Sequence, residues 1–174
     1  MNLIEPAYLV SDGTSLFEMP ELLKQNSFYF VLSANTIIGY VHYSDLNKSI
    51  MKIPFFALFQ LTESALWEKF KDRITEDNMR IVFGEDQAKR FTAARKEATK
   101  SNVDVGWTGV FTFPSILRLA RHFGLVHFTD DEIGLLRDVR NNVSHSDKNL
   151  VAQHSDVEML VRAYSMFQQV IERT

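Results

Sequence analysis

The first 50 residues alternate short apolar runs with polar breaks, a pattern typical of small units that mix strands and helices. Aromatic and β-branched residues cluster in three strand-length runs, at 7–10, 28–32 and 36–41. Residues 33–35 separate the last two runs and predict a hairpin turn. Thr14 and Ser44 are residue types that cap helices, so a helix is expected after each of them.

From Pro54 onward the apolar residues recur at the spacing of a helix. The predicted helices span 54–73, 86–101 and 114–123. Two more are expected after Thr129 and Ser155. Each of these two caps precedes a glutamate by three residues, Glu132 and Glu158, which is the spacing of a capping box.

The change of period divides the chain. Residues 1–53 are predicted to form a small α/β unit, and residues 54–174 an all-α helical bundle. The expected fold class is therefore α+β.

Composition and charge limit the chemistry. The chain has 174 residues, a formal net charge of −3 and no cysteine, which excludes disulfides, thiolate metal sites and a cysteine nucleophile. The five histidines have no metal-ligand spacing, so no structural metal and no tightly held cofactor are expected. A DNA-binding regulator is disfavoured by the lack of excess positive charge.

The chain shows no sequence signal for a membrane. Its first eight residues lack the basic and apolar regions of a signal peptide. The apolar run 50–61 is too short for a membrane span and contains Lys52, Pro54 and Gln60. We therefore expect a cytoplasmic protein without a membrane partner.

The candidate chemistry lies near the end of the helix expected after Thr129, where Arg140, Asn141 and His145 follow one another closely. Arginine is a permanent cation that can grip two phosphate oxygens at once. Histidine both donates and accepts protons near neutral pH. Five residues on a regular helix are about 140° apart, so the helix must loosen, end before His145, or face a second copy of the motif.

This motif and the helices around it resemble a HEPN domain, whose ribonucleolytic members carry arginine, a polar residue, a spacer and histidine. The resemblance covers roughly residues 55–174 and implies metal-independent RNA cleavage by a homodimer. By motif position, Arg140 stabilises charge on the phosphate, Asn141 orients His145 or the phosphate, and His145 transfers the proton. In a non-catalytic alternative, Arg140 pairs with Asp138 or Asp147 and His145 caps helix carbonyls.

Residues 37–46 resemble a single CBS motif, with Gly39, His42 and Asp45 at its ligand-binding positions. The resemblance covers roughly residues 1–55 and implies an adenine nucleotide whose ribose hydroxyls bond to Asp45. Such motifs pack in pairs, so a single one also implies a homodimer. In the alternative interpretation, Asp45 only supports the N-terminus of its own helix.

A third candidate is a basic helix face formed by Lys89, Lys96 and Lys100, which lie on one side of the helix predicted over 86–101. Such a face can follow an RNA backbone, although a solvated helix surface is the more common explanation.

Together the two resemblances imply a HEPN-type endoribonuclease of the toxin or host-defence type, gated by an adenine nucleotide at the CBS-like unit. Its expected partners are a second copy of the chain, RNA and an antitoxin protein. The competing hypothesis is a non-catalytic nucleotide-sensing module that only dimerises or binds a partner.

Overall fold

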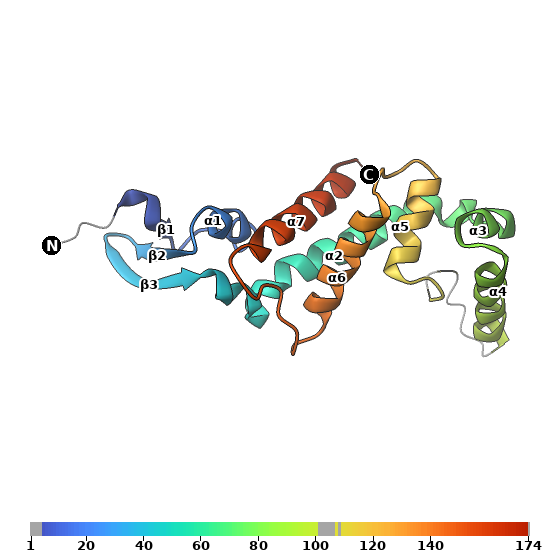
Figure 1. Ribbon diagram of the computed structural model, residues 1–174, viewed down its shortest axis with the longest axis horizontal. Helices are drawn as coiled ribbons and strands as arrows, with labels where there is room; N and C mark the ends of the chain where they lie inside the picture. The colour runs from blue at the N-terminus through green and yellow to red at the C-terminus, as the bar shows by residue number, and fades with distance from the viewer. Residues whose placement is uncertain (1–4, 101–106, 108, 174) are drawn as a thin grey trace. The chain divides into compact units, whose positions relative to one another are not determined.

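The computed structural model describes residues 5–100, 107 and 109–173, and it confirms an α+β chain with one three-stranded sheet and a majority of helical residues (Figure 1). Contacts group the chain into two compact units. One unit contains the residues up to Phe59 together with Asp138–Phe167, and the other contains Gln60–Arg137 and the chain from Gln168 onward. The two domains expected from the sequence, 1–53 and 54–174, remain a prediction.

The sheet belongs to the first unit and has the strand order β1-β2-β3. β1 (Leu9–Ser11) runs parallel to β2 (Phe28–Ser33), and the connection between them contains α1 (Met19–Gln25). β3 (Thr36–His42) returns antiparallel to β2 through the predicted hairpin, where Ala34 adopts a positive φ of 50°. β1 starts later than the run that predicted it, because a 3-10 turn, Pro6–Tyr8, comes first.

The helix expected at Ser44 is a 3-10 helix, η2 (Tyr43–Asn47), and its N-cap is His42. The next helix, α2 (Ser49–Phe70), includes Pro54 in its interior, so it begins before the position predicted for it. Its first turns pack inside the first unit, where Phe55 and Phe59 are almost completely buried. A short 3-10 helix, η3 (Lys71–Arg73), follows α2.

Two helices of the second unit are joined by a single glycine, Gly84. α3 (Glu76–Phe83), which the sequence reading missed, is capped by the Thr75 hydroxyl, which accepts a hydrogen bond of 3.2 Å from the Asn78 N–H. Gly84 has a φ of 83°, a conformation that side chains with a Cβ rarely adopt. The turn at Gly84 separates α3 from α4 (Glu85–Lys100).

The last three helices lie close to their predicted ranges. They are α5 (Phe113–His122), α6 (Asp130–Ser144) and α7 (Asp156–Arg173). The capping box that predicts the start of α6 is confirmed: the Glu132 carboxylate accepts from the Thr129 N–H at 2.9 Å, and the Thr129 hydroxyl accepts from the Glu132 N–H at 3.2 Å.

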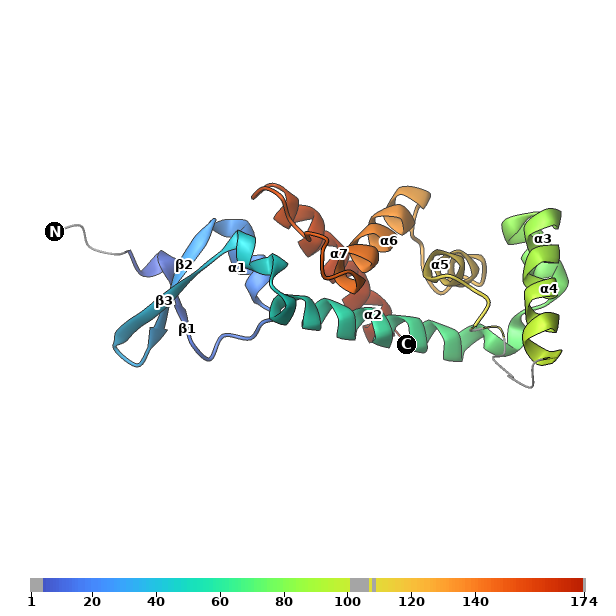
Figure 2. The ribbon, with the colours of Figure 1, turned by 90° about the horizontal axis from the view of Figure 1, so that it is seen from below.

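Within the first unit, α2 packs against the parts of α6 and α7 that belong to that unit (Figures 1 and 2). Tyr164 of α7 makes an edge-on ring contact with Phe55 of α2, with 6.0 Å between ring centroids. Val139 and Val143 present buried side chains on α6. This packing fixes the end of α6, where the candidate catalytic residues lie.

Candidate functional site

The end of α6 lies between Arg140 and His145. α6 stays helical through Asn141 and Asn142 and ends at Ser144, so His145 is the first residue beyond the helix. Of the two arrangements that concern the helix itself, the structure shows the one in which the helix ends before His145, while a second copy of the motif facing the first stays a prediction. The histidine is therefore free of the angular constraint that a regular helix imposes.

Arg140 is held by an aromatic ring. The centre of its guanidinium lies 5.0 Å from the centroid of the Phe59 ring on α2, a cation–π distance. Its Nη1 donates a long hydrogen bond of 3.5 Å to the Asn141 side-chain oxygen. Its Nε is buried without a hydrogen-bond partner. Within the described residues Arg140 makes no ion pair, so the pairing with Asp138 or Asp147 considered above is not found.

His145 has an exposed side chain. Among the residues that the structure describes, no hydrogen bond or ion pair engages its imidazole. Its backbone carbonyl, by contrast, accepts hydrogen bonds from the Lys148 N–H at 3.3 Å and from Lys52 at 2.9 Å. The imidazole does not cap the helix, and it remains available to a ligand.

The carbonyls at the end of α6 are capped by Lys52 of α2. This side chain is only 5% exposed. Its Nζ donates to the carbonyl oxygens of Asn142, His145 and Lys148 at 3.1, 2.9 and 2.6 Å. Lys52 and Phe59 are seven residues apart, so they lie on nearly the same face of α2. One face of α2 thus supports both the Arg140 guanidinium and the turn that carries His145.

Asn47 fixes the chain a few residues further on. Its side-chain oxygen accepts from the N–H groups of Leu150 and Val151 at 2.6 and 3.0 Å, and its amide nitrogen donates to the Val151 carbonyl at 2.8 Å. Lys52 and Asn47 therefore hold residues 142–151 at both ends.

The sequence reading missed Lys52, Asn47 and Phe59 as parts of the site. Lys52 carried a signal, because it is the one charged residue in the run from Ser49 to Leu61. A lysine buried among apolar residues needs polar partners, and these lie about 90 residues away in the sequence. Sequence spacing alone gives no sign of that pairing.

The CBS-like residues lie around η2. Asp45 forms a capping box with His42: its Oδ2 accepts from the His42 N–H at 2.8 Å, and His42 Nδ1 accepts from the Ser44 N–H at 3.3 Å. Its Oδ1 pairs with Lys48 at 2.8 Å. Partial burial acts to raise the pKa of Asp45, but the hydrogen bonds from Lys48 and His42 outweigh it and hold that pKa below its ordinary value.

These residues also border a hollow of about 480 Å³, lined by Tyr40, His42, Ser44, Asp45 and Lys48. Gly39 is exposed on β3 and does not line it. The structural role of Asp45 and a ligand-binding role are compatible, since each carboxylate oxygen can accept more than one hydrogen bond.

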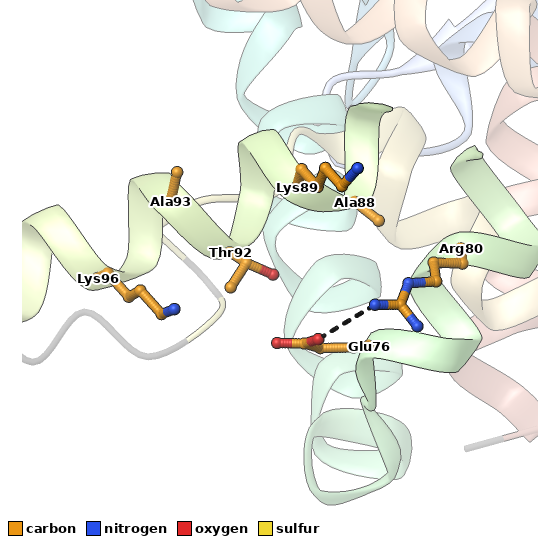
Figure 3. A pocket seen from close by; sticks show the side chains of 7 residues that line it. All are labelled: Glu76, Arg80, Ala88, Lys89, Thr92, Ala93 and Lys96. Carbon is orange, nitrogen blue, oxygen red and sulfur yellow. Dashed lines mark ion pairs between the residues drawn. The ribbon is translucent and has the colours of Figure 1, made fainter. Parts of the chain in front are cut away.

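The three lysines of the basic face all lie along α4 beside α3. Lys89 and Lys96 line a pocket of about 280 Å³ with Glu76, Arg80, Ala88, Thr92 and Ala93 (Figure 3). Lys96 and Lys100 line a neighbouring hollow of about 570 Å³. Lys89 pairs with Glu85 and Lys100 with Glu97, both at 3.2 Å. Of the three, only Lys96 has no ion-pair partner among the described residues.

In the part of the chain that the structure describes, no three His, Asp or Glu side chains gather as a metal site would require. No described helix combines the length and the apolar character needed to cross a bilayer.

Comparison with protein-family models, curated proteins and solved structures finds no match to this chain.

Proposed function

We propose that this chain is a metal-independent endoribonuclease whose active site is formed by Arg140, Asn141 and His145. One observation carries the proposal: neither Arg140 nor His145 has the structural role that the alternative gave it, an ion pair for Arg140 and the capping of helix carbonyls for His145. Within the described residues no carboxylate neutralises Arg140, and Lys52 caps the carbonyls near His145. A cation and an imidazole are thereby left for a ligand at one helix end.

The reaction follows from the groups present. Arg140 binds the non-bridging oxygens of one phosphate and stabilises the charge that develops on them. His145 accepts the proton of the ribose 2′-OH as its oxygen attacks the adjacent phosphorus, and water then protonates the departing 5′-oxygen. In the reverse assignment, water accepts the 2′-OH proton and His145 protonates the 5′-oxygen. The new O2′–P bond forms as the P–O5′ bond breaks. The products are a 2′,3′-cyclic phosphate and a 5′-hydroxyl end.

Asn141 has a positioning role in this proposal. Its side-chain oxygen accepts the bond from Arg140 Nη1. This contact restrains the guanidinium on the face of Phe59 and leaves the side-chain amide nitrogen of Asn141 as a further donor toward a phosphate.

The fold assignment is part of the proposal. Residues 54–174 act as a HEPN-like bundle, and residues 1–53 as a CBS-like unit. An adenine nucleotide in the hollow beside Asp45 is the effector we propose for that unit. Lys48 is exposed and can contact a phosphate there, which favours an anionic ligand over a neutral one.

A homodimer is also part of the proposal, and a stripe on α2 supports it. Ile50, Ile53 and Phe56 are 54%, 57% and 47% exposed. They follow one another at intervals of three residues, so they lie along one side of the helix. The stripe carries no charge, so two copies can meet there without repulsion, as a twofold interface requires.

The basic face of α4 is proposed as an additional RNA-binding surface outside the active site. Lys96 is the residue of this face that we expect to contact an RNA backbone, because the charges of Lys89 and Lys100 are offset within their own helix. An antitoxin partner remains a prediction from the family resemblance.

The test is cleavage of a labelled structured RNA in the presence of EDTA. We expect 2′,3′-cyclic phosphate products, and no reaction with DNA or with RNA that carries 2′-deoxyribose at the cut site. Replacing His145 by alanine should lower kcat by about 10²- to 10⁴-fold, the usual contribution of a general acid or base. The exposed His127, replaced by alanine, is the matched control.

The second candidate is a non-catalytic module that senses nucleotide and dimerises. The hollow bordered by Asp45 and the exposed Lys48 favours it, because a nucleotide can bind there without any chemistry at α6. Absence of cleavage of every RNA tested, or cleavage that persists unchanged after His145→Ala, would decide for this module.

A further inference from the structure

The buried ammonium of Lys52 has no counter-ion within the described residues. A charge that is removed from water without a carboxylate partner costs free energy, so such a lysine is uncommon in a protein interior. Its three N–H groups are all used, because the ammonium has three donors and contacts three carbonyl oxygens. The arrangement satisfies the geometry of the ammonium while keeping its positive charge.

The three carbonyls are those of a helix end. The last four carbonyls of an α-helix lack amide partners within the helix, and Asn142 carries one of these in α6. His145 and Lys148 continue the chain beyond the end of the helix. Lys52 thus replaces the missing donors and connects the last turn of α6 to the turn that follows it.

The charge has a second effect at this position. The C-terminus of a helix has a partial negative charge of about half an elementary unit, which repels an anion such as phosphate. The catalytic candidates lie at that unfavourable end of α6. A full positive charge in contact with the terminal carbonyls offsets the partial negative charge and makes the surrounding potential compatible with a phosphodiester.

We propose that Lys52 is a positioning residue for the phosphate-cleaving end of α6. The buried ammonium fixes the backbone of His145 relative to Arg140, and its charge neutralises the helix terminus so that an RNA phosphate can bind there. Lys52 does not touch the substrate, since its three donors are bonded to the protein. This inference rests on the proposed ribonuclease function.

A positioning role differs from a purely structural one in its kinetics. Displacement of a proton-transfer group lowers kcat, because the transition state depends on alignment more strongly than substrate binding does. A residue needed only for folding would leave the kinetics of the folded fraction unchanged.

The test compares Lys52→Met and Lys52→Arg with the wild type and with Lys69→Met, an exposed lysine of the same helix. Cleavage is measured at a temperature where thermal unfolding shows each protein to be folded. We expect Lys52→Met to lower kcat by about 100-fold, the size of effect that a misplaced catalytic group produces. KM should rise by a smaller factor, because the charge that favours phosphate binding is also removed. Lys69→Met should match the wild type.

Lys52→Arg keeps the charge but, with a planar guanidinium, loses the three-directional donor set. We expect it to fold and to lower kcat by about 10-fold, since it restores only the electrostatic part. If Lys52→Met does not fold, the kcat of Lys52→Arg alone tests the positioning role of Lys52.

A folded Lys52→Met or Lys52→Arg protein with the kcat of the wild type overturns the positioning role while leaving the ribonuclease function standing. An inactive wild type is a different result, because it refutes the ribonuclease itself and the role of Lys52 with it.

Discussion

The Nζ atom of Lys52 lies 2.9 Å from the backbone carbonyl oxygen of His145, although 93 residues separate them in the sequence. This bond joins the buried face of α2 to the first residue after α6. It explains why His145 need not cap its own helix, because a lysine from another helix performs that task. The candidate proton-transfer group is thus held by its backbone and free at its side chain.

The first prediction concerns stability at this contact. Lys52→Met leaves three carbonyl oxygens without their buried donor, so we expect the free energy of unfolding to fall by about 2–4 kcal/mol. Urea denaturation followed by circular dichroism measures the change. Lys69→Met, at an exposed site of the same helix, should leave the midpoint unchanged. Equal midpoints for the two variants would contradict the role of the buried ammonium.

Replacing Arg140 by methionine should affect stability and activity in different ways. Its Nε is a buried donor without a partner, which costs about 1–3 kcal/mol and is only partly offset by the contact with Phe59. Arg140→Met keeps an unbranched side chain on the ring and removes the orphaned donor. We expect the unfolding free energy to stay equal or to rise by about 1 kcal/mol, while RNA cleavage is lost.

The matched control is Arg90→Met, an exposed arginine on α4, which should leave both properties unchanged. A strongly destabilised Arg140→Met protein would show that the guanidinium serves the fold rather than a ligand.

Sequence patterns predicted the local structure well where a local rule was enough. The hairpin between β2 and β3 and the capping box at Thr129 and Glu132 involve neighbours in the chain, and both are confirmed. Helical periodicity predicts a helix from Pro54, whereas α2 begins at Ser49 and contains Pro54 in its interior.

The candidate site was less accessible to prediction. The spacing of Arg140 and His145 left open whether the helix loosens or ends before His145, and only the end of α6 at Ser144 distinguishes these two arrangements. The support from Lys52, Asn47 and Phe59 depends on how α2 and η2 pack against distant segments. Such contacts are tertiary, and periodicity within one segment carries no information about them.

Asn47 provides a test that is independent of RNA. Asn47→Ala removes three hydrogen bonds to Leu150 and Val151, so we expect a loss of about 1–3 kcal/mol in unfolding free energy. Hydrogen exchange at the amides of Leu150 and Val151 should become faster than at other protected sites. Asn149→Ala, at an exposed position in the same turn, is the control and should change neither quantity.

Asp45 gives a prediction about pH. Because its folded pKa lies below the ordinary value of 3.8, the ionised carboxylate stabilises the fold above about pH 4. That contribution is lost as the pH falls through the folded pKa. Asp45→Asn should therefore lower the unfolding midpoint at neutral pH and show a smaller further loss on acidification than the wild type. Parallel curves for the two proteins between pH 6 and pH 2, measured by thermal unfolding, would show that Asp45 adds nothing to the acid sensitivity.

The exposed stripe on α2 leads to a prediction about assembly. Ile53 lies between Ile50 and Phe56, so a glutamate there places two like charges close together across a twofold interface. We expect the wild type to be a dimer and Ile53→Glu to be a monomer when each is measured by light scattering after gel filtration. Ile81, which is 71% exposed on α3 and is not part of the stripe, provides the control, and Ile81→Glu should remain dimeric. If Ile53→Glu keeps the mass of a dimer, the copies meet elsewhere. If the wild type is itself a monomer at micromolar concentration, the homodimer proposal fails. Any RNA cleavage by that monomer would then need only one chain.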